Sequence, residues 1–170
     1  MRIKNKKPVL VFMLSAAIIL FFALRVVINV TPSMPEGIYF KSSASFTREN
    51  IVLVCLDEVF QHLGISQRYL LRGHYICSQT RPLIKHIIAI PGDHVVLSDQ
   101  AITVNGHDYL YPTFYQDARQ RRLNVYPRGD YQQTSAYWLL GEAVNSWDSR
   151  YWGPVDRRAI KNRLIPLVTW

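Results

Sequence analysis

Hydrophobic residues follow two patterns along this chain. From residue 8 to residue 24 every position except Ser15 is apolar, whereas beyond residue 30 the apolar residues form short runs between polar, turn-favouring residues. The first pattern predicts a long apolar helix, and the second is typical of short β-strands. We therefore expect one N-terminal helix followed by a β-rich domain.

The short runs are rich in β-branched and aromatic residues, which favour extended backbone. The predicted strands are residues 37–40, 51–55, 84–90, 94–97, 101–104 and 137–140. Turns are expected at Pro91-Gly92-Asp93 and at Asn105-Gly106, because Pro fixes φ and Gly accepts a positive φ. This alternation of strands and turns predicts an all-β domain.

Two segments beyond residue 30 differ from the strands. Residues 57–71 carry Phe60 and Leu63 at loose helical spacing, which predicts one helix. Residues 111–134 are polar and rich in arginine, a composition typical of a surface loop or an extended insertion, with a role in gripping substrate or lipid headgroups as the alternative. The chain shows no repeats, so residues 31–170 are expected to form a single domain.

Residues 8–30 are long enough to cross a bilayer, since a helix of this length spans about 34 Å at ~1.5 Å per residue and the hydrocarbon core is about 30 Å thick. Four basic residues precede this segment, which predicts a cytoplasmic tail over residues 1–7 and an exported domain over residues 31–170. A cleaved secretory signal is the rival interpretation, but its apolar core is usually shorter, roughly 7–15 residues. We therefore expect an uncleaved transmembrane anchor over residues 8–30.

The charge of the chain is concentrated at its N-terminal end. The 170 residues carry a net charge of +8, and 49% of them are hydrophobic. Five positive charges lie before residue 30, in a stretch without acidic residues, so the remainder carries only +3. The hydrophobic fraction supports a folded core, and the weak charge of the domain argues against nucleic acid as a partner.

The chain contains two cysteines, Cys55 and Cys77, and both lie in the part expected to be exported. In an oxidising compartment they could form a disulfide, and two buried thiols are the alternative. The cysteines and histidines do not follow the spacing of a metal site, so neither a metal nor a cofactor is expected.

Lys85 interrupts the apolar run Ile84 to Ile90. Because alternate residues of a strand share a face, Leu83, Lys85 and Ile87 would line one side, and both sides of this strand are apolar. Burial disfavours the charged form of lysine, and a neutral amine is a competent general base. A lysine that reaches solvent or pairs with an acid at the sheet edge is the alternative interpretation.

Ser33 lies directly after the apolar segment, between Pro32 and Pro35. The two prolines stiffen the backbone, so the hydroxyl of Ser33 could be held at one fixed position. Thr31 precedes it by two residues, and its hydroxyl could join the Ser33 backbone N–H in stabilising an oxyanion. An ordinary turn serine is the alternative for Ser33 considered alone.

The segment 145–155 places polar side chains between aromatic ones, which indicates a rigid, hydrogen-bonded turn. Asp148 and Arg150 are close enough in sequence to form a local ion pair. The alternative is a structural turn whose aromatic residues complete the core.

Three segments together resemble the main sequence boxes of type I signal peptidases, in the order found in that family. They are Thr31-Pro-Ser-Met34, Leu83-Ile-Lys-His-Ile-Ile-Ala-Ile-Pro-Gly-Asp-His-Val95 and Asn145-Ser-Trp-Asp-Ser-Arg-Tyr-Trp-Gly-Pro-Val155. The resemblance implies a twisted, mostly antiparallel β-fold and a Ser/Lys dyad, with Ser33 as nucleophile and Lys85 as general base.

The same resemblance implies supporting roles for other residues. Thr31 would supply an oxyanion donor together with the N–H of Ser33, and Ser146 would hydrogen-bond and orient the amine of Lys85. Asp148 and Arg150 would brace the turn that carries Ser146.

The sequence around Ser33 resembles one branch of the family more closely than the others. Ser33 is followed by Met34-Pro-Glu-Gly-Ile-Tyr39, and Gly141-Glu-Ala-Val-Asn145 replaces the Gly-Asp-Asn run of general leader peptidases. These features and the single anchor are similar to the TraF-type peptidases of conjugative transfer. The implied substrate is a pilin precursor, matured by cleavage and, in some members, by cyclisation.

The resemblance further implies a single-pass protein of the bacterial inner membrane, with its catalytic domain on the periplasmic side. Membrane lipid and the conjugative transfer or secretion apparatus would then be partners. Three other functions stay open at this point: a general signal peptidase that cleaves many preproteins, a non-catalytic, membrane-anchored β scaffold, and a Ser/His hydrolase, although no histidine lies in a motif that would orient it.

Overall fold

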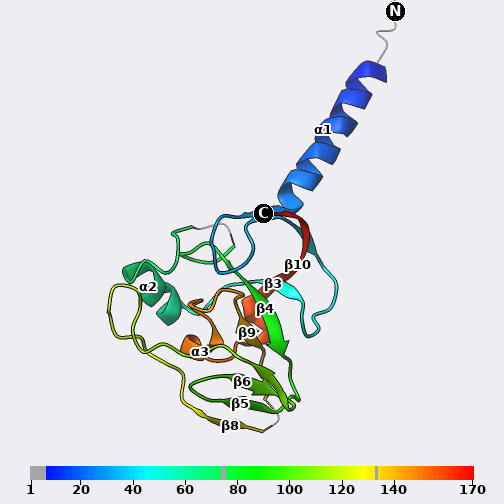
Figure 1. Cartoon of the computed structure of the whole chain (residues 1–170). Coiled ribbons are helices and arrows are strands. Elements are labelled where there is room, and N and C mark those ends of the chain that lie inside the picture. Colours follow the sequence, from blue (N-terminus) through cyan, green and yellow to red (C-terminus); the bar gives the residue numbers. More distant parts are fainter. Residues whose placement is uncertain (1–6, 74–75, 133) are drawn as a thin grey trace, which may run out of the picture.

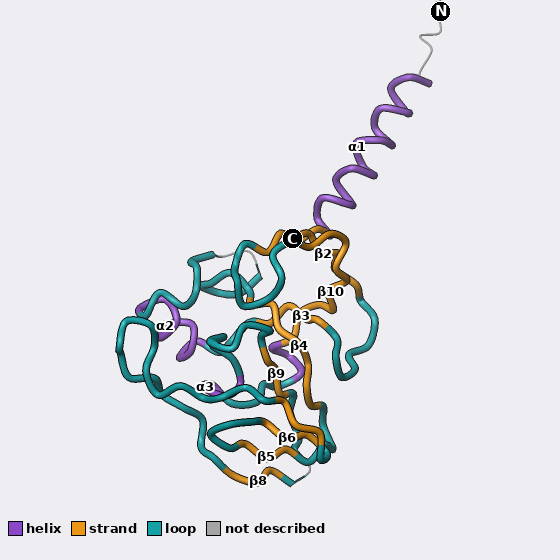
Figure 2. Tube along the Cα trace, in the orientation of Figure 1, coloured by secondary structure: helices purple, strands orange, loops and turns teal. Residues whose placement is uncertain are grey.

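The computed structural model describes residues 7–73, 76–132 and 134–170. Helix α1 (Lys7–Arg25) extends away from the remainder of the chain, and the C-terminal end of the chain lies near the base of this helix (Figure 1). Beyond α1 the chain folds into two antiparallel β-sheets with two short helices, and long irregular connections link them (Figure 2).

The larger sheet has the strand order β1-β2-β10-β3-β4-β9, and all its neighbouring strands are antiparallel. Its strands are β1 (Val26–Asn29), β2 (Gly37–Ser42), β3 (Ile51–Val54), β4 (Leu83–Ala89), β9 (Trp138–Leu140) and β10 (Ile160–Thr169). β4 lies between β3 and β9, so the strand that carries Lys85 is an interior strand, as its apolar sequence predicts.

The smaller sheet has the order β7-β6-β5-β8 and is also antiparallel. Its strands are β5 (Val95–Leu97), β6 (Ile102–Val104), β7 (His107–Tyr109) and β8 (Gly129–Tyr131). Asn105 and Gly106 both have positive φ, 50° and 84°, and connect β6 to β7 as a two-residue hairpin. Gly92, with φ 96°, likewise forms the predicted turn after β4.

Both short α-helices begin at aspartate caps. The carboxylate of Asp57 accepts a hydrogen bond from the Phe60 backbone N–H and begins α2 (Glu58–Ser66), and Asp148 caps α3 (Ser149–Trp152). The helix predicted within residues 57–71 is therefore present but shorter. It ends at Ser66, with Gln67 as its C-cap, and Arg68 directly after it has a positive φ of 62°. A 3-10 turn, η1 (Arg157–Ala159), precedes β10.

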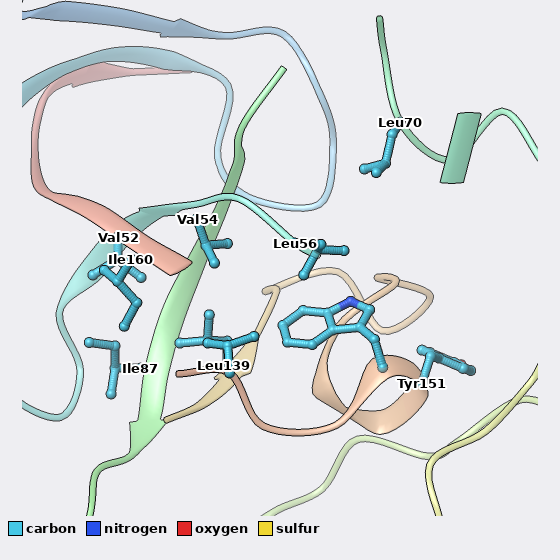
Figure 3. Packing of buried hydrophobic residues seen from close by; sticks show 10 residues of the cluster. Val52, Val54, Leu56, Leu70, Ile87, Leu139, Tyr151 and Ile160 are labelled. Carbon is cyan, nitrogen blue, oxygen red and sulfur yellow. The ribbon is translucent and has the colours of Figure 1, made fainter. Parts of the chain in front are cut away.

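The main core lies between the larger sheet and the short helices. Val52, Ile87 and Ile160 meet Leu139, Leu56 and Tyr151 in this cluster (Figure 3). A second cluster joins the two sheets through Trp138, and a third contains Met34, Tyr39 and Leu53. Met34 is only 1% exposed, so this third cluster anchors the chain directly after Ser33.

The prediction of one continuous helix over residues 8–30 is wrong at its C-terminal end. The helix ends at Arg25, and Val26–Asn29 forms β1 instead, because this β-branched stretch pairs with β2. Within the residues that the structure describes, no helix combines the length and the apolar character that crossing a membrane requires. The predicted cytoplasmic tail lies, apart from Lys7, outside the described residues.

The prediction for residues 111–134 is partly correct. Most of this segment is irregular and lies at the surface, but β8 within it pairs with β5 and completes the smaller sheet. The predicted strands are confirmed to within a few residues, whereas β1, β7, β8 and β10 were not predicted.

Candidate active site

Lys85 lies at the centre of β4 with only 1% of its surface exposed. Its amine donates a hydrogen bond of 2.9 Å to the Ser146 hydroxyl. The pKa of Lys85 is lowered from its usual 10.5 to about 8, because burial disfavours the charged amine, the charge of Asp148 only partly opposes this shift, and the charge of Arg150 adds to it. A substantial fraction of this amine is therefore neutral at mildly alkaline pH, as a general base requires.

Ser33 lies in a loop between β1 and β2 that is fixed at both sides. The buried side chain of Met34 holds the loop to the core, and the Ser33 carbonyl accepts hydrogen bonds from the backbone N–H groups of Glu142 (2.9 Å) and Ala143 (3.4 Å). These contacts bind the loop of Ser33 to the segment that leads to Ser146.

Gly141 allows this close approach. A methyl group at Gly141 would lie 2.2 Å from the Ser146 hydroxyl oxygen and 2.7 Å from the Ser33 carbonyl oxygen. The Ser33 backbone, the Ser146 hydroxyl and, through Ser146, the Lys85 amine are thus gathered at one place. Residues 33, 85 and 146 are far apart in the sequence, and the fold brings them together.

Asp148 and Arg150 form a fully buried, bidentate ion pair, with both contacts at 2.8 Å. Arg150 also donates to the carbonyls of Val144 (2.9 Å) and Ser146 (3.0 Å), and Asp148 accepts from the Gly141 N–H (3.2 Å). Burial alone would lower the pKa of Arg150, but hydrogen bonding to Asp148 and its charge raise it. The pair therefore ties both ends of the turn that carries Ser146.

Thr31 is exposed, and its hydroxyl donates a hydrogen bond of 2.8 Å to the Asn29 side-chain oxygen. The threonine proposed as an oxyanion donor thus has a partner within the protein. The sequence does not indicate Asn29, because the apolar pattern of residues 8–30 predicts one continuous helix. A lone amide at the end of an apolar run, two residues before a threonine, is the feature that could have indicated it.

Glu142 is a second residue that the sequence did not single out. Its backbone N–H donates to the Ser33 carbonyl, and its carboxylate contacts the His86 ring nitrogen at 2.8 Å. His86 follows Lys85 in β4, so Glu142 connects the Ser33 loop to the strand that carries Lys85. This connection is additional to the one through Ser146.

A groove with a volume of about 390 Å³ begins beside the Ser33 loop. It is lined on one side by β1 and Thr31, and on the other by Ile84 and by residues of the segment 69–82. Cys55 and Cys77 form a disulfide, so this segment is covalently attached to the end of β3. The groove is mostly apolar.

A family model described as signal peptidase, peptidase S26, matches residues 4–169. The chain belongs to this family. Its members are peptidases, and the signal peptidase assignment agrees with the order of the three sequence segments that carry Ser33, Lys85 and Ser146.

Relatives of this chain have names that refer to plasmid transfer or conjugal transfer. It is 31% identical over 149 residues to a plasmid transfer protein TraF of Escherichia coli, covering 84% of this chain and 82% of that protein. It is 28% identical to the conjugal transfer protein TraF of Agrobacterium fabrum, over 84% of this chain and 82% of that protein.

A crystal structure of a signal peptidase I from Enterococcus faecalis matches 73% of this chain and 100% of that chain, with 18% identity and a TM-score of 0.41. No group of three or more metal-binding side chains occurs among residues 7–73, 76–132 and 134–170 of the signal peptidase-family chain.

Proposed function

We propose that this chain is a membrane-anchored serine endopeptidase that matures an exported precursor, in particular a conjugative pilin. The observation that carries the proposal is the buried amine of Lys85, hydrogen-bonded to Ser146 at the point where the Ser33 loop meets residues 141–146. Similarity to TraF proteins of conjugative plasmids supports the choice of substrate.

The proposed reaction uses one serine and one lysine. Neutral Lys85 accepts the proton of the Ser33 hydroxyl while the oxygen attacks the scissile carbonyl, and the resulting ammonium then gives its proton to the departing amine. The Ser33 N–H and the Thr31 hydroxyl are the proposed donors to the oxyanion. Lys85 next deprotonates a water that releases the acyl chain, and attack by an amine of the same precursor would give a cyclic product instead.

We further propose that the apolar segment beginning at Pro8 anchors the chain in the bacterial inner membrane, with residues 31–170 on the periplasmic side. The large apolar side chains of α1 from Leu10 to Leu24 are exposed, and lipid would cover them. The basic residues that precede the segment favour a cytoplasmic N-terminus. Lipid and the conjugative transfer apparatus are the proposed partners.

Co-expression of the full chain with candidate pilin precursors, followed by intact-mass analysis, tests the proposal. We expect a mature product with the wild type and only precursor with Ser33→Ala or Lys85→Met. Ser45→Ala and Lys161→Met are matched controls at exposed positions and should leave processing intact.

The masses also separate the alternatives. A cyclic product is lighter than the linear product by one water, so cyclisation and hydrolysis are distinguished directly. Unchanged maturation in both Ser33→Ala and Lys85→Met would favour a non-catalytic scaffold, and equal cleavage of many unrelated preproteins would favour a general signal peptidase.

A further inference from the structure

Asn29 ends β1 directly beneath the loop that carries Ser33, and only 4% of its surface is exposed. Its amide nitrogen donates to the carbonyls of Thr31 (3.0 Å), Met34 (3.0 Å) and Pro35 (2.9 Å). Its side-chain oxygen accepts from the Thr31 N–H (3.1 Å) and from the Thr31 hydroxyl (2.8 Å). One carboxamide therefore contacts both sides of Ser33.

The loop depends on this side chain because it contains few donors of its own. Pro32 and Pro35 lack a backbone N–H, so the loop cannot satisfy its carbonyls by internal hydrogen bonds alone. An amide group has two hydrogens and here faces three carbonyl oxygens, so at least one hydrogen is shared. The loop is folded around the amide of Asn29, with Tyr39 as a second donor to the Pro35 carbonyl at 2.6 Å.

The contact with the Thr31 hydroxyl bears on the chemistry. A hydroxyl has one hydrogen, and in this structure Thr31 donates it to Asn29. To donate to an oxyanion instead, the Thr31 hydroxyl only has to rotate, since its backbone N–H also bonds to Asn29 and holds the residue in place.

We propose that Asn29 is a positioning residue of the active site. It fixes the backbone of the Ser33 loop, and it holds the Thr31 hydroxyl hydrogen until the substrate's developing oxyanion replaces the Asn29 oxygen as acceptor. The proposal rests on the function proposed above and adds a residue to its machinery.

Asparagine is the residue that meets both demands. Aspartate has the same shape and keeps an oxygen for Thr31, but it lacks the two N–H donors and would turn a negative charge toward three carbonyls. Leucine has a similar volume and makes none of the five hydrogen bonds. Asn29→Asp and Asn29→Leu therefore separate the acceptor function from the donor function.

The kinetic test uses the full chain and a peptide that spans the cleavage site. We expect Asn29→Asp to lower kcat about 100-fold while KM changes less than about threefold, because misplacement of reacting groups costs rate on this scale. Asn124→Asp, the same change at an exposed asparagine, should leave both constants unchanged. Wild-type kcat in Asn29→Asp would overturn the proposal.

Coupling between Asn29 and Thr31 is measured by a double-mutant cycle. Thr31→Val should lower kcat, whereas Thr31→Ser, which keeps the hydroxyl, should stay near the wild-type kcat. The double variant Asn29→Leu with Thr31→Val should have a kcat within about threefold of that of Asn29→Leu alone. If the fold-decrease in kcat of the double variant equals the product of the two single decreases, the two residues act independently. The proposal that Asn29 holds the Thr31 hydroxyl would then be wrong.

Hydrogen exchange gives a readout that needs no activity. Asn29→Asp should speed amide exchange in residues 30–37 and leave β3 and β4 as in the wild type. If Ser33→Ala leaves processing unchanged, the proposed function fails, and the exchange data still decide whether Asn29 holds the loop. Unchanged exchange in residues 30–37 would overturn the inference by itself.

Discussion

Burial lowers the proton affinity of the Lys85 amine, and it does so despite a nearby carboxylate. Lys85 is 1% exposed in an interior strand, where it pairs with Val52 of β3, and its amine contacts a neutral hydroxyl, that of Ser146. Asp148 raises the pKa of Lys85 through its charge, but Arg150 neutralises Asp148 in a buried pair and itself lowers that pKa. Burial therefore outweighs the compensation by Asp148, and the neutral form of Lys85 is favoured more than in a solvent-exposed lysine.

The rate of cleavage should rise with pH through about 8. The pKa of Lys85 is lowered to about 8, and only the neutral amine can accept the Ser33 proton. We expect kcat for a peptide substrate, measured from pH 6 to pH 10, to increase about tenfold per unit below the midpoint and then to level off. A rate that falls across this interval would contradict the assignment of Lys85 as base.

Lys85→Met should stabilise the fold while it abolishes activity. The folded-state pKa of about 8 lies below the unfolded value of 10.5, so the unfolded chain binds more protons between these values and wild-type stability rises with pH in that window. Below pH 8 the folded protein must keep the charged Lys85 amine buried, which lowers the free energy of unfolding by on the order of 3 kcal/mol. The hydrogen bond to Ser146 offsets about 1 kcal/mol of this.

Urea unfolding at pH 7 and pH 10.5 measures this effect. The unfolding free energy of Lys85→Met should exceed that of the wild type at pH 7, and the difference should shrink at pH 10.5. Lys161→Met, at an exposed lysine, is the control that should show neither change. A variant less stable than the wild type at pH 7 would show that the amine is not penalised by burial.

At the scale of elements, the sequence predicts those strands whose local pattern agrees with their pairing. β4 is apolar on both faces and interior, and the Asn105-Gly106 turn has the positive φ values that its residues favour. β10 was not predicted because it contains charged residues and Pro166, and its pairing with β2 shifts register between Pro166 and Val168. The apolar pattern predicts helix for β1, because only the pairing with β2 distinguishes this strand from the apolar segment before it.

Gly141→Ala should abolish activity with little effect on the remainder of the fold. The added methyl group would lie 2.2 Å from the Ser146 hydroxyl oxygen and 2.7 Å from the Ser33 carbonyl oxygen, so the Ser33 loop and Ser146 must move apart. A displacement of about 1 Å at a reacting centre costs on the order of 100-fold in rate. We expect kcat to fall at least that far.

Gly129→Ala provides the matched control. A methyl group there meets nothing nearer than 3.8 Å, so its activity should equal that of the wild type. Wild-type activity in Gly141→Ala would mean that the contact between the Ser33 loop and Ser146 is not needed for catalysis.

For the whole molecule, the candidate site is assembled from three segments, which contain Ser33, Lys85 and residues 141–150. Sequence boxes singled out residues with recognisable chemistry, such as Ser146 and Asp148. They did not single out Asn29 or Glu142, because the importance of these residues lies in contacts to backbone atoms that become neighbours only in the fold. The sequence also left the state of Cys55 and Cys77 open, and the structure contains the disulfide.

Loss of that disulfide should weaken substrate binding more than catalysis. Cys55 and Cys77 are separated by 22 residues, and closure of such a loop stabilises a fold by about 3 kcal/mol. The disulfide attaches the groove wall formed within residues 69–82, whereas Lys85 and Ser33 are held by β4 and by residues 141–150. We therefore expect combined Cys55→Ser and Cys77→Ser to raise KM several-fold with kcat nearly unchanged, and to lower the Tm.

Buried Gln61 should limit the rise in KM of the serine variant. Its side chain donates to the Leu56 carbonyl (2.7 Å) and accepts from the Gln79 N–H (3.0 Å), so it holds the same groove wall without the disulfide. Adding Gln61→Ala to the serine variant should then raise KM further than it does in the wild type. A reductant should reproduce the higher KM in the wild type and leave the serine variant unaffected. A fall in kcat at constant KM would instead mean that the disulfide supports the reacting groups and that the groove wall does not depend on it.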